Sequence, residues 1–117
     1  MIFKTAAEMA TALAAKEVSS VELTQQHLDR IASVDGKINA FLHIDSAGAL
    51  EQADAIDKKR ASGEKISPLA GVPIAVKDIL AQKGIPTTAG SKILEGWRPP
   101  YDSTVVAKLK AAGVVIL

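Results

Sequence analysis

The sequence predicts an α/β fold in which N-terminal helices pack on the start of a mixed β-sheet. Two regions with different patterns lead to this prediction. Residues 1–66 are mainly helical in pattern, with apolar residues at helical spacing behind Ser and Thr caps. Residues 67–117 contain two short β-branched runs, separated by a Gly/Pro-rich loop and one helical stretch. The 117 residues lie within the usual size of one domain.

The composition excludes several classes of function. Hydrophobic residues make up 48% of the chain and aromatic residues only 3%, so we expect a core of Ala, Val, Ile and Leu. A net charge of +1 gives no electrostatic argument for nucleic acid or an anionic membrane. The absence of cysteine rules out disulfides and thiolate metal sites and suits a cytoplasmic protein. No apolar run approaches the ~18 residues of a membrane span, so no membrane association is expected.

Two local patterns predict the first two helices. Thr5 and Ser19 each stand three residues before a glutamate, which is the capping-box arrangement at a helix start. We therefore expect one helix over residues 5–16 and a second that begins at Ser19. The Asp-Gly pair at 35–36 is expected to end the second helix.

Residues 38–44 are short, apolar and partly alternating, and they predict a strand. A third helix is then expected to begin at Asp45 or Ser46. Its buried face is expected to consist of three apolar residues at helical spacing: Leu50, Ala53 and Ile56.

Charged residues in this third helix allow two interpretations. The Lys-Lys-Arg triplet at 58–60 could bind nucleic acid, but in the last turn of a helix it also opposes the helix dipole favourably. Asp54 and Asp57 lie three residues apart among lysines and predict an exposed face. For the Lys-Lys-Arg triplet we therefore favour a solvated helix end over a nucleic-acid site.

Because His27 and His43 have no acidic or histidine partner at ligand spacing, no metal site is expected.

The stretch most suggestive of chemistry is residues 71–78, which read Gly-Val-Pro-Ile-Ala-Val-Lys-Asp. It predicts a strand over 72–77 whose core face is Val72, Ile74 and Val76. The opposite face places the small Ala75 beside Lys77, which leaves room for the lysine to be buried. A buried lysine can take a proton from a neighbouring hydroxyl. The alternative is an ordinary solvated lysine at a strand end.

Residues 81–101 form a long Gly/Pro-rich loop, which is typical of a functional or a disordered segment. Its apolar residues, such as Ile93 and Tyr101, favour an ordered loop. A helix capped by Asp102 or Ser103 and a buried-type strand over 114–117 follow. A bare apolar strand normally continues into further structure, so we expect an N-terminal portion of a larger α/β protein. We also expect an exposed, association-prone final strand.

Residues 71–78 resemble the lysine strand of the amidase signature family. The resemblance continues, in order, through further segments: 83–88, 90–96 and 99–106, with 19–23 and 39–41 upstream. Ser-Lys-Ile-Leu-Glu and Pro-Pro-Tyr-Asp are most similar to the A subunits of glutamyl-tRNA(Gln) amidotransferases. The resemblance implies that residues 1–117 are the N-terminal part of a single amidase-signature domain, incomplete in this chain. Residues 1–66 would be its mainly helical region and 67–117 the start of its sheet core.

This resemblance implies a Ser–cis-Ser–Lys catalytic triad in which Lys77 is the base. Both serines would lie downstream in a Gly/Ser-rich segment that these 117 residues lack, so we expect this chain alone to be inactive. The substrate would be glutamine, and the freed ammonia would pass to a B subunit. That subunit would use ATP, with Mg, to amidate glutamate on tRNA(Gln), and a C subunit would complete the complex. No cofactor is expected on this chain itself.

Two other functions remain open on the sequence. One is a stand-alone amidase of the same family that acts on small or aryl amides without tRNA. The other is a non-catalytic helical interaction module, because the chain holds no nucleophile in a triad-like setting.

Overall fold

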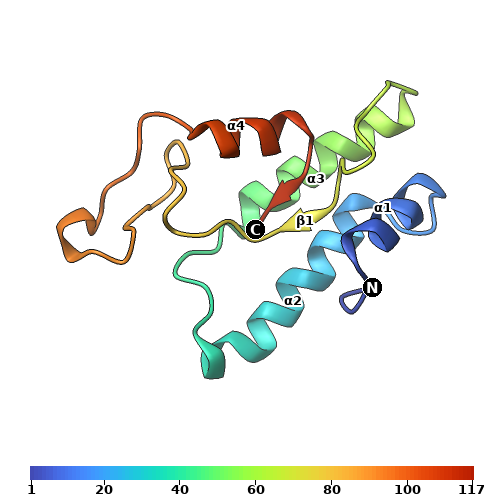
Figure 1. The fold of residues 1–117 in the computed structure, drawn as a ribbon. Coiled ribbons are helices and arrows are strands. Elements are labelled where there is room, and N and C mark those ends of the chain that lie inside the picture. The colour runs from blue at the N-terminus through green and yellow to red at the C-terminus, as the bar shows by residue number, and fades with distance from the viewer.

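The computed structural model describes residues 1–117 and confirms the α/β class. Four α-helices, two strands and one 3₁₀ turn follow one another along the chain: α1 (Ala6–Ala14), α2 (Ser20–Ile38), α3 (Ser46–Ala61), β1 (Pro73–Ile74), the 3₁₀ turn Lys92–Leu94, α4 (Thr104–Ala111) and β2 (Val115–Ile116). Helix α2 packs on both α3 and β1, and α3 also contacts β2. The long connection from β1 to α4 extends away from the three N-terminal helices (Figure 1). None of the helices combines the length and hydrophobicity needed to span a bilayer.

The two strands form a small parallel sheet at the centre of the fold. Pro73 lies opposite Val115, and Ile74 opposite Ile116. The Val115 N–H donates to the Val72 carbonyl at 2.9 Å. A parallel pair requires a crossover connection, and the chain between the strands, including α4, supplies it. Both strands are shorter than predicted, because residues beyond Ile74 have no neighbouring strand in this chain.

The predicted helix caps are confirmed. Thr5 and Ser19 each form a complete capping box with the glutamate three residues later. Asp45 caps α3 by accepting from the Gly48 N–H, and Ser103 caps α4 by accepting from the Val106 N–H. The signals for these helix starts are local in sequence, which is why they could be found without the fold.

The predicted strand over residues 38–44 is wrong, and so is the predicted end of the second helix. Helix α2 continues through Gly36 to Ile38, and Asn39 ends it in the left-handed conformation at φ 54°. The Asp35 carboxylate accepts from the Ala40 N–H at 2.8 Å and holds the chain as it leaves the helix. The next residues form irregular structure, because no strand lies beside them to complete a ladder.

Helix α3 approaches the sheet through small side chains. Ala49 and Ala53 are fully buried and cluster with Val115, and Ile56 is also buried. Leu50, predicted for this face, is only half-buried. The predicted face is therefore confirmed at Ala53 and Ile56, Ala49 takes the place predicted for Leu50, and the alanines let the helix lie close to β2.

The prediction of an exposed face at Asp54 and Asp57 is half wrong. Asp54 forms a surface ion pair with Lys58 at 2.6 Å. Asp57 instead accepts from the N–H groups of Ser20 and Val21, at 2.8 and 3.0 Å. These are free donors in the first turn of α2, so a carboxylate from α3 caps a helix that starts 37 residues earlier.

Asp57→Ala is expected to destabilise the chain by about 2 kcal/mol, because two N–H groups lose a charged acceptor. Asp54→Ala is the matched control, and it removes only an exposed pair, so little change is expected. Denaturant unfolding measures both variants. Equal stability of the two variants would contradict the capping role of Asp57.

The expected exposure of the final strand is also wrong. Val115 and Ile116 are buried. The outward edge of β2 is not bare either, since the Ile116 N–H donates to the Gln52 side-chain oxygen at 3.1 Å. The Gln52 amide also donates back to the Ile116 carbonyl at 3.4 Å. A side-chain amide from α3 thus stands where a neighbouring strand would pair, and it protects the edge.

Candidate active site

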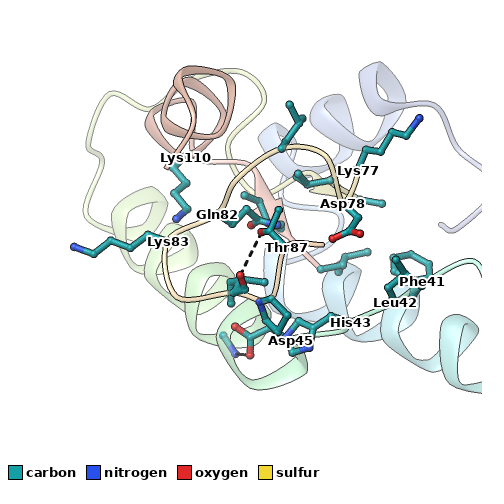
Figure 2. Close-up of a pocket in the computed structure, with 18 of the residues that line it drawn as sticks. Phe41, Leu42, His43, Asp45, Lys77, Asp78, Gln82, Lys83, Thr87 and Lys110 are labelled. Atoms are coloured by element: carbon teal, nitrogen blue, oxygen red, sulfur yellow. Dashed lines mark hydrogen bonds between the residues drawn. The ribbon is translucent and has the colours of Figure 1, made fainter. Parts of the chain in front are cut away.

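An open pocket of about 1320 Å³ lies at the carboxyl ends of the two parallel strands. Residues 75–80, which leave β1, form one part of its wall, and residues 85–90 form another. Residues 40–43 and α3 close the opposite side (Figure 2). The carboxyl edge of a parallel sheet is the usual place for a ligand site in α/β folds.

Lys77 lines this pocket from the segment just beyond β1. The prediction that it is buried beside Ala75 is wrong for this chain, where both residues are exposed. The alternation of faces ends where the strand ends, after Ile74. The predicted core face, opposite Ala75 and Lys77, is confirmed as apolar, since Val72 is buried and Val76 packs on a core cluster. None of the ion pairs in the chain involves Lys77.

Asp78, the next residue, is tied to the turn at residues 88–90. Its carboxylate accepts from the Thr88 N–H at 2.8 Å, from the Thr88 hydroxyl, and from the Gly90 N–H at 3.3 Å. Its main-chain carbonyl accepts from the Ala89 N–H at 3.1 Å. The Thr88 hydroxyl and then the Thr88 N–H hold the pKa of Asp78 below its ordinary value. We call this set of hydrogen bonds the Asp78 clasp.

The Asp78 clasp is expected to weaken in acid. Because the pKa of Asp78 is lower in the folded chain than the ~3.9 of an unfolded aspartate, its stabilisation is fully present above about pH 4. It is lost as the pH falls through the folded pKa. Asp78→Asn should therefore have a lower Tm than the wild type above about pH 4, and the difference should shrink on acidification. A difference that grows on acidification would contradict this assignment.

A second carboxylate orders the far end of the same loop. Asp102 pairs with the Lys110 ammonium at 2.8 Å and accepts from the Lys83 N–H at 2.7 Å. The Lys110 hydrogen bond, followed by that from Lys83, lowers the pKa of Asp102. Of the apolar anchors predicted for the loop, Ile93 is 92% exposed and Tyr101 is 56% exposed, whereas Ile85, Leu94 and Trp97 are half-buried. Hydrogen bonds from Asp78 and Asp102 add to these three anchors in ordering the loop.

Neither histidine forms a metal site. The His27 ring nitrogen Nδ1 lies 2.8 Å from the Leu23 carbonyl oxygen, one turn earlier in the same helix. His43 is exposed at the pocket wall. No group of three or more His, Cys, Asp or Glu side chains is placed to hold a metal ion.

Two parts of the site could not be predicted from the sequence. Residues 40–43 reach the pocket as irregular structure after α2, whereas a strand was predicted over residues 38–44. The partners of Asp78 were also missed, because Thr88 lies ten residues away and no local pattern signals the contact. The Thr-Thr-Ala-Gly run at 87–90 is part of the predicted loop and overlaps the family resemblance, but the sequence assigns it no contact with Asp78.

The fold of this chain matches that of the amidase signature family. The Amidase family model matches residues 22–117, and the chain belongs to the amidase signature family. It is similar to the A subunit of the glutamyl-tRNA(Gln) amidotransferase of Salinispora arenicola, with 62% identity over 112 residues. It is 57% identical over 117 residues to the corresponding protein of Acidothermus cellulolyticus. These matches cover 96% and 100% of this chain, and 23% of each relative.

Solved structures support the same family. The peptide amidase of Stenotrophomonas maltophilia matches with a TM-score of 0.91 and 34% identity, over 98% of this chain and 24% of that one. A bacterial aryl acylamidase of the amidase signature family matches with a TM-score of 0.91 and 30% identity, over the same shares. The chain therefore spans about a quarter of the length of its relatives, and its predicted fold class is confirmed.

Proposed function

We propose that this chain is the N-terminal part of the glutamine-hydrolysing A subunit of a tRNA-dependent amidotransferase. The observation that supports this most is the 57–62% identity to such subunits over nearly the whole chain. Identity to the peptide amidase and the aryl acylamidase is only 34% and 30%. Residues 1–117 would be part of a single amidase-signature domain. We call the longer protein that contains this chain the complete enzyme.

In the proposed mechanism, Lys77 is the base of a Ser–cis-Ser–Lys triad. The bridging serine passes the proton of the nucleophilic serine to Lys77, and the serine oxygen attacks the glutamine carboxamide carbon. The C–N bond breaks, ammonia leaves with a returned proton, and water hydrolyses the acyl-enzyme. The position of Lys77 supports this role, because it stands at the pocket wall with no carboxylate to neutralise it. Both serines would come from outside the 117 residues.

The proposal also includes partners. Ammonia would pass to a B subunit, which would use ATP, with Mg, to amidate Glu-tRNA(Gln) in the cytoplasm. A C subunit would complete the complex. This chain would bind no cofactor of its own.

Co-expression of the complete enzyme with its B and C subunits tests the proposal. The purified complex is expected to release ammonia from glutamine and to convert Glu-tRNA(Gln) to Gln-tRNA(Gln) when ATP is present. The 117-residue chain alone is expected to release none. Hydrolysis of peptide or aryl amides without glutaminase activity would favour the stand-alone amidase instead.

A further inference from the structure

The Asp78 clasp joins the residue after Lys77 to a turn ten residues further along the chain. Four hydrogen bonds connect Asp78 to residues 88–90, three to its carboxylate and one to its carbonyl. Three of these four bonds fall on one half-exposed side chain. It lies directly beside Lys77 in the chain, so any effect of the clasp on the site would act on that lysine.

Asp78 does not act as the counter-ion of Lys77. No ion pair joins the two side chains. In Figure 2 the Lys77 side chain extends away from the Asp78 carboxylate. All acceptor positions that Asp78 uses are turned toward Thr88 and Gly90. Its effect on where Lys77 lies is therefore exerted through the main chain that the two residues share.

The main chain at Lys77 has few other supports. The last sheet hydrogen bond before it is at Ile74, whose carbonyl accepts from the Leu117 N–H at 3.0 Å. After it, the Lys77 carbonyl accepts from the Leu80 N–H at 2.9 Å and forms a short turn. The Lys77 side chain itself is exposed. Val76 packs on a core cluster, and the tie at Asp78 is the first hydrogen bond beyond β1 to a separate segment of the chain.

We propose that Asp78 is a positioning residue, whose clasp on residues 88–90 fixes the main chain at Lys77 and thereby the place of its side-chain amino group. This inference rests on the proposed function of Lys77. Proton transfer requires heavy atoms within hydrogen-bond reach. A displacement of about 1 Å can cost a catalytic step about 10²-fold. A loosened clasp should therefore slow the chemical step and leave glutamine binding intact.

Thr88→Val in the complete enzyme, assembled with its partner subunits, is the test. Valine keeps the shape and the N–H but removes the hydroxyl that donates to Asp78. We expect kcat for glutamine hydrolysis to fall about 10- to 100-fold, with KM for glutamine nearly unchanged. Thr88→Ser retains the hydroxyl and should restore most of kcat. Rates are normalised to the folded fraction from thermal unfolding.

Asp78→Asn is the second variant if Thr88→Val does not fold, and it should show the same loss of kcat at unchanged KM. If the variant that folds has the same kcat as the wild type, the proposal is overturned. Equal losses in Thr88→Val and Thr88→Ser would also overturn it, since only one of them lacks the hydroxyl.

The variant Lys77→Met, measured in parallel, separates the role of Asp78 from the role of Lys77. If Lys77→Met is inactive and Thr88→Val has a wild-type kcat, the positioning role fails while the role of Lys77 stands. If Lys77→Met keeps its activity, the proposed function fails, and the positioning inference fails with it.

Discussion

Lys77→Met in the complete enzyme is expected to lower kcat for glutamine hydrolysis by at least about 10³-fold. Methionine has a similar length but cannot accept a proton, so the serine would lose its base. The folded structure should not suffer, because Lys77 is exposed and forms no ion pair in this chain. Ammonia release at saturating glutamine gives kcat directly.

Lys92→Met is the matched control for that variant. Lys92 is also an exposed lysine, but it lies in the 3₁₀ turn and does not line the pocket. Its replacement should leave kcat within about twofold of the wild type. A Lys77→Met enzyme with activity close to that of the control would show that Lys77 is not the base.

Gly71→Ala is expected to destabilise the chain by about 3 kcal/mol, for two reasons that add. Gly71 has φ 91°, a left-handed conformation that strains any residue with a Cβ. A Cβ there would also lie 2.8 Å from the buried Ser20 hydroxyl, which itself donates to the Gly71 carbonyl. The strand that leads to Lys77 begins two residues later, so the same change should disturb the site.

Gly63→Ala separates the strain at Gly71 from the steric clash. Gly63 has φ 78°, but a Cβ added to it would meet nothing within 4 Å. Only the cost of the left-handed conformation remains, about 1–2 kcal/mol. Denaturant titration followed by circular dichroism measures both variants. Equal losses would mean that the close approach of Gly71 to Ser20 carries no cost.

The parts of the fold that could be predicted from sequence are those with local signals. Thr5 and Ser19 mark helix starts because their glutamate partners lie three residues away. The contacts that were missed join residues far apart in sequence. Asp57 caps α2 across 37 residues, and Asp78 reaches Thr88 across ten. Nothing in a periodic pattern reports such pairs.

The prediction of a strand at residues 38–44 failed, and the strand predicted over 72–77 was too long, for a related reason. A strand needs a partner, and apolar alternation at residues 38–44 did not reveal that no partner is present in this chain. The same limit applies to Lys77. Its expected burial assumed that β1 continues to residue 77, whereas the strand ends at Ile74 and leaves the lysine at an open pocket. Its identity as the candidate base came from the family resemblance, and its place at the pocket from the structure.

A crystal structure of the complete enzyme is the most direct test of the central claim, that Lys77 serves a serine nucleophile. The proposal predicts a serine hydroxyl within about 2.6–3.2 Å of the Lys77 Nζ atom, and a second serine within reach of the first, at the wall of the present pocket. A Lys77 side chain that points into solvent, with no serine hydroxyl near its Nζ atom, would contradict the claim.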